Sequence, residues 1–144
     1  MRNGPNKAHE MVHVVVDTNV LVSALIGRGK PRRLVLKLLE EHLIVLSRQM
    51  LVELADVLSR EKFSDVRSSQ VDKFLSGLVK KCKVVNVVPS FEVFKEDPDD
   101  DVVLNMAFSG KAEYMITGDK HLLALKEFKG VRIVKVTQMF DVIR

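Results

Sequence analysis

The chain has 144 residues, of which 47% are hydrophobic and 29% are charged, and its formal net charge is +4. This length and balance predict one globular domain whose core needs no disulfide. The longest apolar runs are far too short to cross a membrane, which excludes a membrane-spanning protein. Cys82 is the single cysteine, so an intramolecular disulfide is excluded and a cytoplasmic location is expected. Its neighbours Lys81 and Lys83 favour a lowered thiol pKa, although a structural thiol is the better interpretation.

Charge and polarity are unevenly distributed along the chain. Residues 1–10 are polar and lack the apolar core of a signal peptide, so we expect a flexible leader or an expression remnant, followed by one domain at 11–144. Segment 92–101 carries six acidic residues and one basic residue, whereas the rest of the chain carries 22 basic and 13 acidic residues. An acidic focus on a basic body is typical of a protein that binds a polyanion and holds cations at one place.

Buried strands and amphipathic helices alternate in the chain. The β-branched run at 12–16 predicts a strand buried on both faces, which ends at Asp17. Apolar runs predict further strands at 43–46, 83–88, 114–117 and, as an edge strand, 131–136. Apolar residues at helical spacing predict helices at 20–25, 32–42, 48–60 (capped by Ser47), 68–81, 97–109 and 122–125, with a last short helix capped by Thr137. This order predicts an α/β fold, a three-layer α/β/α sandwich with a mostly parallel sheet of about five strands.

Four acidic residues fall where such a fold brings them to one edge of the sheet. Asp17 and Asp119 each follow an apolar strand, and parallel strands end on the same side. Asp101 lies in the first turns of the helix at 97–109, and Glu53 lies less than two turns into the helix at 48–60. Helices that follow parallel strands begin at that same edge, so the sequence predicts a cluster of carboxylates there.

Each acid also has an ordinary structural interpretation. Asp17 and Asp119 can serve as N-caps, and Glu53 can be a solvated helix residue. The run Asp97-Pro98-Asp99-Asp100 resembles a common helix start, with acids near the positive end of the helix dipole. This account explains Asp101 less well, because Asp101 lies deeper in the helix.

Electrostatics favour a joint interpretation of the four acids. Two carboxylates about 4 Å apart repel each other by about 4 kcal/mol at an effective dielectric constant near 20. A divalent cation reverses the sign of this interaction, and oxygen ligands favour Mg²⁺ or Mn²⁺ over zinc. The four histidines lack the spacing of a zinc site and are better explained as surface or packing residues. Asn19 and Thr117 are candidates to hydrogen-bond the acids.

Four segments together resemble the PIN-domain nucleases, specifically the small stand-alone PIN proteins that act as toxins of prokaryotic toxin–antitoxin pairs. They are Val15–Leu21 (VVDTNVL), Glu53 within LVEL, Asp97–Asp101 (DPDDD) and Ile116–Leu122 (ITGDKHL). Each motif alone is weak, but their order and their positions on the predicted elements make the set specific.

The resemblance implies a Rossmann-like sandwich and a Mg²⁺- or Mn²⁺-dependent endoribonuclease that cleaves single-stranded RNA. It implies a catalytic set of Asp17, Glu53, Asp101 and Asp119, in which Asp17, Asp101 and Asp119 hold the metal and Glu53 binds through water or orients the attacking water. It implies that Asn19, Thr117, Asp97 and Asp100 support this set. It further implies an antitoxin partner and a homodimer.

Two alternatives and one weaker assignment accompany this interpretation. A catalytically silent PIN-fold regulator that binds RNA or a protein partner would show the same acids. A receiver- or phosphatase-like phosphoryl-transfer enzyme is less favoured, because Asp17-Thr18-Asn19 lacks the second acid of an Asp-x-Asp nucleophile motif. Basic residues near the same edge are weak candidates to bind RNA phosphates, and for each one solvated surface charge is the better single explanation: Arg28, Lys30, Arg32, Arg33 and Lys120.

Overall fold

The computed structural model describes residues 11–60, 67–87, 92–93 and 98–143 of the chain. The expected leader at 1–10 and the candidate Asp97 lie outside these described residues. Within them, the chain forms six strands and seven helices. The strands are β1 (His13–Val16), β2 (Leu43–Ser47), β3 (Lys83–Val85), β4 (Tyr114–Ile116), β5 (Glu127–Phe128) and β6 (Val131–Val134). The helices are α2 (Thr18–Ile26), α3 (Lys30–Glu41), α4 (Arg48–Arg60), α5 (Ser68–Lys81), α6 (Pro98–Ser109), α7 (Lys120–Leu125) and α8 (Val136–Ile143).

The strands form one sheet in the order β3-β2-β1-β4-β6-β5. All neighbouring pairs are parallel except β5 with β6, which is antiparallel. β1 lies inside the sheet between β2 and β4, and Val14, Val15 and Val16 are fully buried. A strand covered on both faces can be apolar throughout, which is why this β-branched run forms β1. The predicted α/β fold with a mostly parallel central sheet is therefore confirmed.

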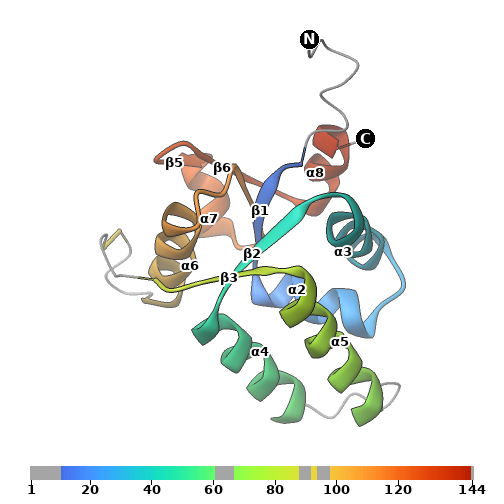
Figure 1. Ribbon diagram of the computed structural model, residues 1–144. Helices are drawn as coiled ribbons and strands as arrows, with labels where there is room; N and C mark the ends of the chain where they lie inside the picture. The colour runs from blue at the N-terminus through green and yellow to red at the C-terminus, as the bar shows by residue number, and fades with distance from the viewer. Residues whose placement is uncertain (1–10, 61–66, 88–91, 94–97, 144) are drawn as a thin grey trace.

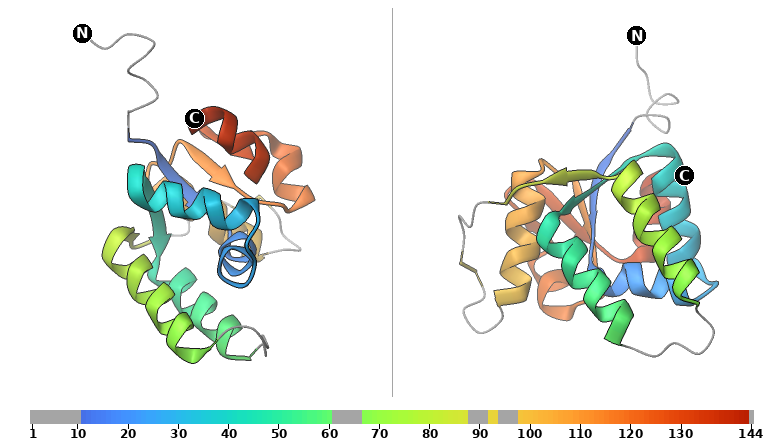
Figure 2. Two further views of the ribbon diagram at one scale, coloured as in Figure 1. Left: turned by 90° about the vertical axis from the view of Figure 1, so that its right-hand side faces the viewer. Right: turned by 60° about the horizontal axis from the view of Figure 1, so that its bottom comes forward.

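Helices cover both faces of the sheet. Helices α6 and α7 lie on one side of the strands, and α3 and α8 lie on the other (Figure 1). The two further views show the same separation (Figure 2). Leu34 and Leu38 of α3 and Leu104 and Met106 of α6 are fully buried. The core therefore occupies the space on each side of the sheet, as a three-layer fold requires.

The second half of the sheet differs from the prediction at one place. The strand predicted as an edge strand at 131–136 is β6, which ends at Val134 and lies inside the sheet because β5 covers its far side. Lys129 and Gly130 join β5 to β6 with positive φ angles of 51° and 89°. Two such residues are typical of the tight hairpin turn that matches strand twist. The two-residue strand β5 is too short to show a pattern in the sequence.

Element boundaries otherwise agree closely with the predictions. Ser47 caps α4 as expected, because its Oγ accepts a 3.0 Å hydrogen bond from the N–H of Met50. The predicted cap at Thr137 is wrong, because α8 begins at Val136, two residues earlier than a helix capped by Thr137 would, and Thr137 lies inside its first turn. The residue before the helix is Lys135, whose N–H donates to Oε1 of Gln138 at 2.8 Å. Strand β3 ends at Val85, and residue 88, the predicted end, lies outside the described residues.

The burial of Cys82 decides between the two sequence interpretations of its thiol, a lowered pKa and a structural role. It is buried at the end of α5, and burial raises its pKa to about 12. The less favoured alternative, a thiol pKa lowered by Lys81 and Lys83, is therefore wrong, because both lysines are exposed while the sulfur is desolvated. The better sequence interpretation, a structural thiol, agrees with this burial.

None of the described helices is long and apolar enough to cross a membrane.

Candidate metal centre

Asp17 stands at the carboxyl end of β1, at the centre of the sheet edge. Its backbone N–H donates to the carbonyl of Ile116 at 2.9 Å, which joins the end of β1 to the end of β4. Its carbonyl accepts the first N–H groups of α2. The side chain forms no capping hydrogen bond of standard geometry to α2, and the N–H groups of Thr18 and Asn19 influence its pKa less than Thr117 does, so a simple N-cap does not describe Asp17.

Thr117 connects the two acids that follow β1 and β4. Its hydroxyl donates a 2.7 Å hydrogen bond to Oδ2 of Asp17 and accepts a 3.0 Å hydrogen bond from the N–H of Asp119. The residue is only 1% exposed. A buried hydroxyl with both of its roles satisfied has a fixed orientation, so Thr117 fixes the position of Asp17 relative to Asp119.

The pKa of Asp17 is raised above its usual value of 3.8, and burial is the largest cause. The hydrogen bond from Thr117 lowers this pKa, as do the backbone N–H groups of Asn19 and Thr18, but they do not offset the burial. The negative charge of Asp119 raises it further. Asp17 and Asp119 are thus close enough to repel each other, and a cation between them would relieve this repulsion.

Asp119 is both a helix cap and a member of a polar cluster. Its Oδ1 accepts hydrogen bonds from the N–H groups of His121 at 2.8 Å and Leu122 at 3.2 Å, so it caps α7 as the ordinary interpretation proposes. It also lies with Asp100 and His121 in a group whose potential ligand atoms are all within 4.8 Å of one another. Asp100, on the first turn of α6, is 7% exposed. Helices α6 and α7 therefore bring two carboxylates and one imidazole together.

This donor set fits a divalent metal ion. Ligand atoms around one octahedral Mg²⁺ ion are about 3 to 4 Å apart, given bond lengths of about 2.1 Å. The observed spacing of up to 4.8 Å is slightly wider, so small side-chain rotations would bring the three groups onto one ion. Carboxylate oxygens suit Mg²⁺ and Mn²⁺, while an imidazole adds preference for the transition metal.

Three residues of the predicted catalytic set lie outside this group: Asp17, which Thr117 links to Asp119, and Asp101 and Glu53. Asp101 is partly buried, and its Oδ1 accepts a 3.0 Å hydrogen bond from the N–H of Val93. Glu53 lies on an exposed position of α4. Among the described residues, neither belongs to the group formed by Asp100, Asp119 and His121.

The other predicted site residues lie at the periphery. Asn19 is exposed on the first turn of α2, and Lys120 is exposed at the start of α7, next to Asp119. The segment that joins α2 to α3 lies on the opposite side of the molecule from α6 (Figure 1). Four of the candidate RNA-binding residues are therefore not gathered near α6: Arg28, Lys30, Arg32 and Arg33.

The sequence analysis does not predict two members of this group, His121 and Asp100, as metal ligands. His121 was interpreted as a surface or packing residue, although it follows Asp119 by two positions at a helix start. Asp100 was interpreted as a supporting residue or an ordinary helix-start acid. The phase of α6 decides between neighbouring acids, and it buries Asp100 while leaving Asp101 more accessible. Three consecutive acids give no periodic signal for that phase.

An open, mostly parallel sheet with Asp17, Thr117 and Asp119 at adjacent strand ends defines an α/β protein whose polar site lies at the carboxyl edge of the sheet. The PIN domain family model matches residues 13–121, so the chain belongs to the PIN domain family. It is also similar to "Uncharacterized protein MJ1680" of Methanocaldococcus jannaschii, with 31% identity over 120 residues, 81% of this chain and 76% of the relative.

Two solved structures have a similar fold. VapBC2 from Rickettsia felis, solved bound to a DNA fragment from its promoter, aligns with a TM-score of 0.60 and 16% identity, over 86% of this chain and 98% of the other. PAE2754 from Pyrobaculum aerophilum aligns with a TM-score of 0.60 and 20% identity, over 93% of this chain and 98% of the other. At these identities the similarity shows the fold.

Proposed function

We propose that this chain is a metal-dependent endoribonuclease that hydrolyses phosphodiester bonds of single-stranded RNA. The observation that carries the proposal is the group of Asp100, Asp119 and His121 beside the buried carboxylate of Asp17. Membership of the PIN domain family supports a nuclease, and the excess of basic residues outside segment 92–101 supports a polyanionic substrate.

We assign the metal ligands to Asp100, Asp119 and His121, with Asp17 completing the site. We assign to Asp100 the ligand role expected for Asp101, because among the described residues Asp100 groups with Asp119 and His121. Asp101 instead accepts a hydrogen bond from the backbone of Val93. The catalytic role of Glu53, to bind through water or to orient the attacking water, stays a prediction. Mg²⁺ or Mn²⁺ is the proposed ion.

The residues of the chain perform distinct tasks in this mechanism. A bound divalent ion supplies Lewis acidity, which makes a water nucleophilic near neutral pH and stabilises the charge on the phosphate. Thr117 donates a hydrogen bond to Oδ2 of Asp17 and so orients this carboxylate at the end of β1. The capping bonds to α7 hold Asp119 in place without using both of its oxygens. Lys120, next to Asp119, is positioned to attract an RNA phosphate.

We also propose that the chain acts in the cytoplasm as the toxin of a toxin–antitoxin pair, with an antitoxin protein as its partner, and that it forms a homodimer. The VapBC2 structure from Rickettsia felis supports this proposal through its similar fold. Co-expression with the product of a neighbouring small gene, followed by purification and mass determination, tests both parts. A monomer that binds no such product would contradict them.

Cleavage of a labelled, unstructured RNA tests the nuclease proposal directly. We expect cleavage with Mn²⁺ or Mg²⁺, none with EDTA, and none by an Asp17→Asn variant. The matched control is Asp72→Asn, which changes an exposed acid on α5 and should cleave as the wild type does. Cleavage that survives both EDTA and Asp17→Asn would reveal a contaminating nuclease. Tight RNA binding without cleavage in either metal would favour the catalytically silent regulator.

A further inference from the structure

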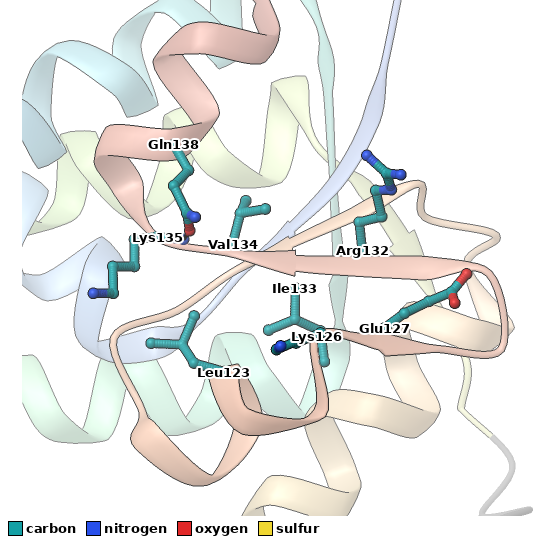
Figure 3. A pocket seen from close by; sticks show the side chains of 8 residues that line it. All are labelled: Leu123, Lys126, Glu127, Arg132, Ile133, Val134, Lys135 and Gln138. Atoms are coloured by element: carbon teal, nitrogen blue, oxygen red, sulfur yellow. Dashed lines mark hydrogen bonds between the residues drawn. The ribbon is translucent and has the colours of Figure 1, made fainter.

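A pocket with a basic rim lies beside the candidate metal centre. Its volume is about 500 Å³, and it is formed by the end of α7, by β6 and by the start of α8. Lys135 and Leu123 lie at one end, Arg132 and Glu127 lie at the other, and Lys126 and Ile133 lie between them (Figure 3). The rim thus carries three basic side chains and one acidic side chain.

From this pocket we infer a nucleotide subsite, in which Lys126 and Lys135 bind a backbone phosphate of the RNA strand next to the one that is cleaved. This inference rests on the proposed function, because it assumes that RNA crosses the metal centre. The subsite gives the RNA strand a second contact with the protein besides the metal centre, and none of the predicted RNA-binding residues supplies this contact.

The position of the pocket supports the inference. Helix α7 starts directly after Asp119, and Lys126 follows its last residue. Six helical residues span about 9 Å, so the two ends of α7 join the metal centre to the pocket over a short distance. On the sheet, the N–H of Thr117 donates to the carbonyl of Val134 at 3.0 Å. Lys135 follows Val134, and it therefore lies close to Thr117 of the candidate metal centre.

The chemistry of the pocket fits a nucleotide. Lys126, Arg132 and Lys135 are exposed, and within the described part of the chain none of them forms an ion pair. Their charges are thus available to an anionic ligand. Three apolar residues also line the pocket, with Leu123 and Ile133 on one side of β6 and Val134 on the other (Figure 3). Pockets of a few hundred Å³ with apolar lining residues and a few polar groups are typical of small-molecule sites, and a nucleotide offers both a flat base and a charged phosphate.

A peptide is the competing occupant. Strand β5 pairs with β6 at Val131 and Arg132, and beyond it the N–H of Ile133 donates to the carbonyl of Lys126 at 2.9 Å and the N–H of Lys135 donates to Oε1 of Gln138 at 2.8 Å. An added peptide strand would compete with these hydrogen bonds, and its binding would depend on backbone hydrogen bonds more than on lysine charge. The excess of positive charge around the rim favours the RNA strand.

Binding in EDTA separates this inference from the nuclease proposal, since it requires neither metal nor cleavage. Fluorescence anisotropy of a labelled, unstructured RNA would compare the wild type with Lys126→Glu/Lys135→Glu. We expect about tenfold weaker binding, and a salt dependence whose slope falls by roughly 0.7, the amount for the one lost phosphate contact. The matched control is Lys73→Glu/Lys80→Glu, which changes two exposed lysines of α5 and should bind almost as the wild type does. Circular dichroism verifies that both variants fold.

The outcomes distinguish the two proposals. If the wild type never cleaves RNA but the double variant still loses binding, the nuclease proposal fails and the subsite stands. If the double variant binds RNA like the control variant, the subsite inference is overturned, and a peptide partner becomes the better occupant. A free mononucleotide that binds the wild type but not the double variant, and that leaves RNA binding unchanged, would also overturn it, because the pocket would then hold a free nucleotide and not the strand. A neutral variant, Lys126→Gln/Lys135→Gln, should show an intermediate loss.

Discussion

The hydroxyl of Thr117 donates a 2.7 Å hydrogen bond to Oδ2 of Asp17, although the two residues are 100 positions apart in the sequence. β1 and β4 are direct neighbours in the sheet, which places the residues that follow them side by side. The same hydroxyl accepts the N–H of Asp119. One buried side chain therefore sets the distance between two acids of the candidate metal centre.

A Thr117→Val variant tests this arrangement. Valine keeps the shape of threonine but leaves Oδ2 of Asp17 without its donor and the N–H of Asp119 without its acceptor. We expect the free energy of unfolding to fall by about 1–3 kcal/mol in urea denaturation. The pKa of Asp17 should rise further, because the lost hydrogen bond lowers it. Mn²⁺ titration by calorimetry should accordingly show the largest loss of affinity at acidic pH.

Thr117→Ser is the control for that variant, because serine keeps the hydroxyl and loses only a methyl group. It should retain most of the metal affinity and the wild-type pH profile. Equal losses of metal affinity in Thr117→Ser and Thr117→Val would show that the hydroxyl does not position the acids.

The raised pKa of Asp17 predicts how stability depends on pH without metal. Below pH 3.8 the carboxyl is protonated in the folded and the unfolded states. As the pH rises from 3.8 through the higher folded pKa, the unfolded state loses its proton first, so stability is lost across this window. Asp17→Asn removes this cost, and the variant should be more stable than the wild type at neutral pH in EDTA. Urea denaturation at several pH values measures this difference.

The same variant should respond differently to metal. Mn²⁺ should raise the melting temperature of the wild type and of the control Asp72→Asn, but raise that of Asp17→Asn much less. If Asp17→Asn and the wild type have equal stability at every pH in EDTA, the buried charge of Asp17 carries no energetic cost.

The sequence predicted the fold and the two acids at the strand ends because both depend on local patterns. A β-branched run followed by Asp17 predicts a buried strand with an acid at its end. The Thr-Gly-Asp segment likewise places an acid, Asp119, just after β4. Because parallel strands end at the same edge of the sheet, this pattern alone predicts that Asp17 and Asp119 lie near each other. These inferences follow from strand periodicity and from the common direction of the strands.

The residues that helices contribute to the candidate metal centre were harder to predict. The phase of α6 depends on how Leu104, Met106 and their neighbours pack against the sheet, and a run of three acids is compatible with more than one phase. His121 joins Asp100 only because α6 and α7 lie on the same side of the sheet (Figure 1). The hairpin of β5 and β6 was not predicted, because its first strand has only two residues. Tertiary packing decided each of these features.

Neighbouring acids on α6 give a direct test of the ligand assignment. Asp100→Asn should weaken Mn²⁺ binding strongly, whereas Asp101→Asn should change it little, because Asp101 lies outside the group around Asp119. His121→Ala should reduce affinity for Mn²⁺ more than for Mg²⁺, since an imidazole ligand suits the transition metal better. Calorimetric titration with each metal measures these affinities. A stronger loss in Asp101→Asn than in Asp100→Asn would return the third ligand to Asp101.

The buried thiol of Cys82 should be unreactive in the folded protein. Burial raises its pKa to about 12, so almost no thiolate exists near pH 8, and the sulfur is also shielded from reagents. We expect an aromatic disulfide reagent to modify the native protein only at the rate at which it unfolds. In denaturant, one thiol per chain should react at once. Rapid modification of the native protein would show that the end of α5 opens readily.

Gly110 and Gly77 form a matched pair for testing how closely α6 packs on the sheet. A Cβ at Gly110 would collide with Cγ1 of Val45, a fully buried residue of β2, and would lie 3.2 Å from the carbonyl oxygen of Met106. Gly110→Ala should therefore lower the free energy of unfolding by about 1–3 kcal/mol. Gly77 lies within α5 with nothing within 4 Å of its Cβ position. Gly77→Ala should instead raise stability by up to about 1 kcal/mol. Urea denaturation of both variants checks the opposite signs, and a stable Gly110→Ala variant would mean that α6 packs less closely against β2.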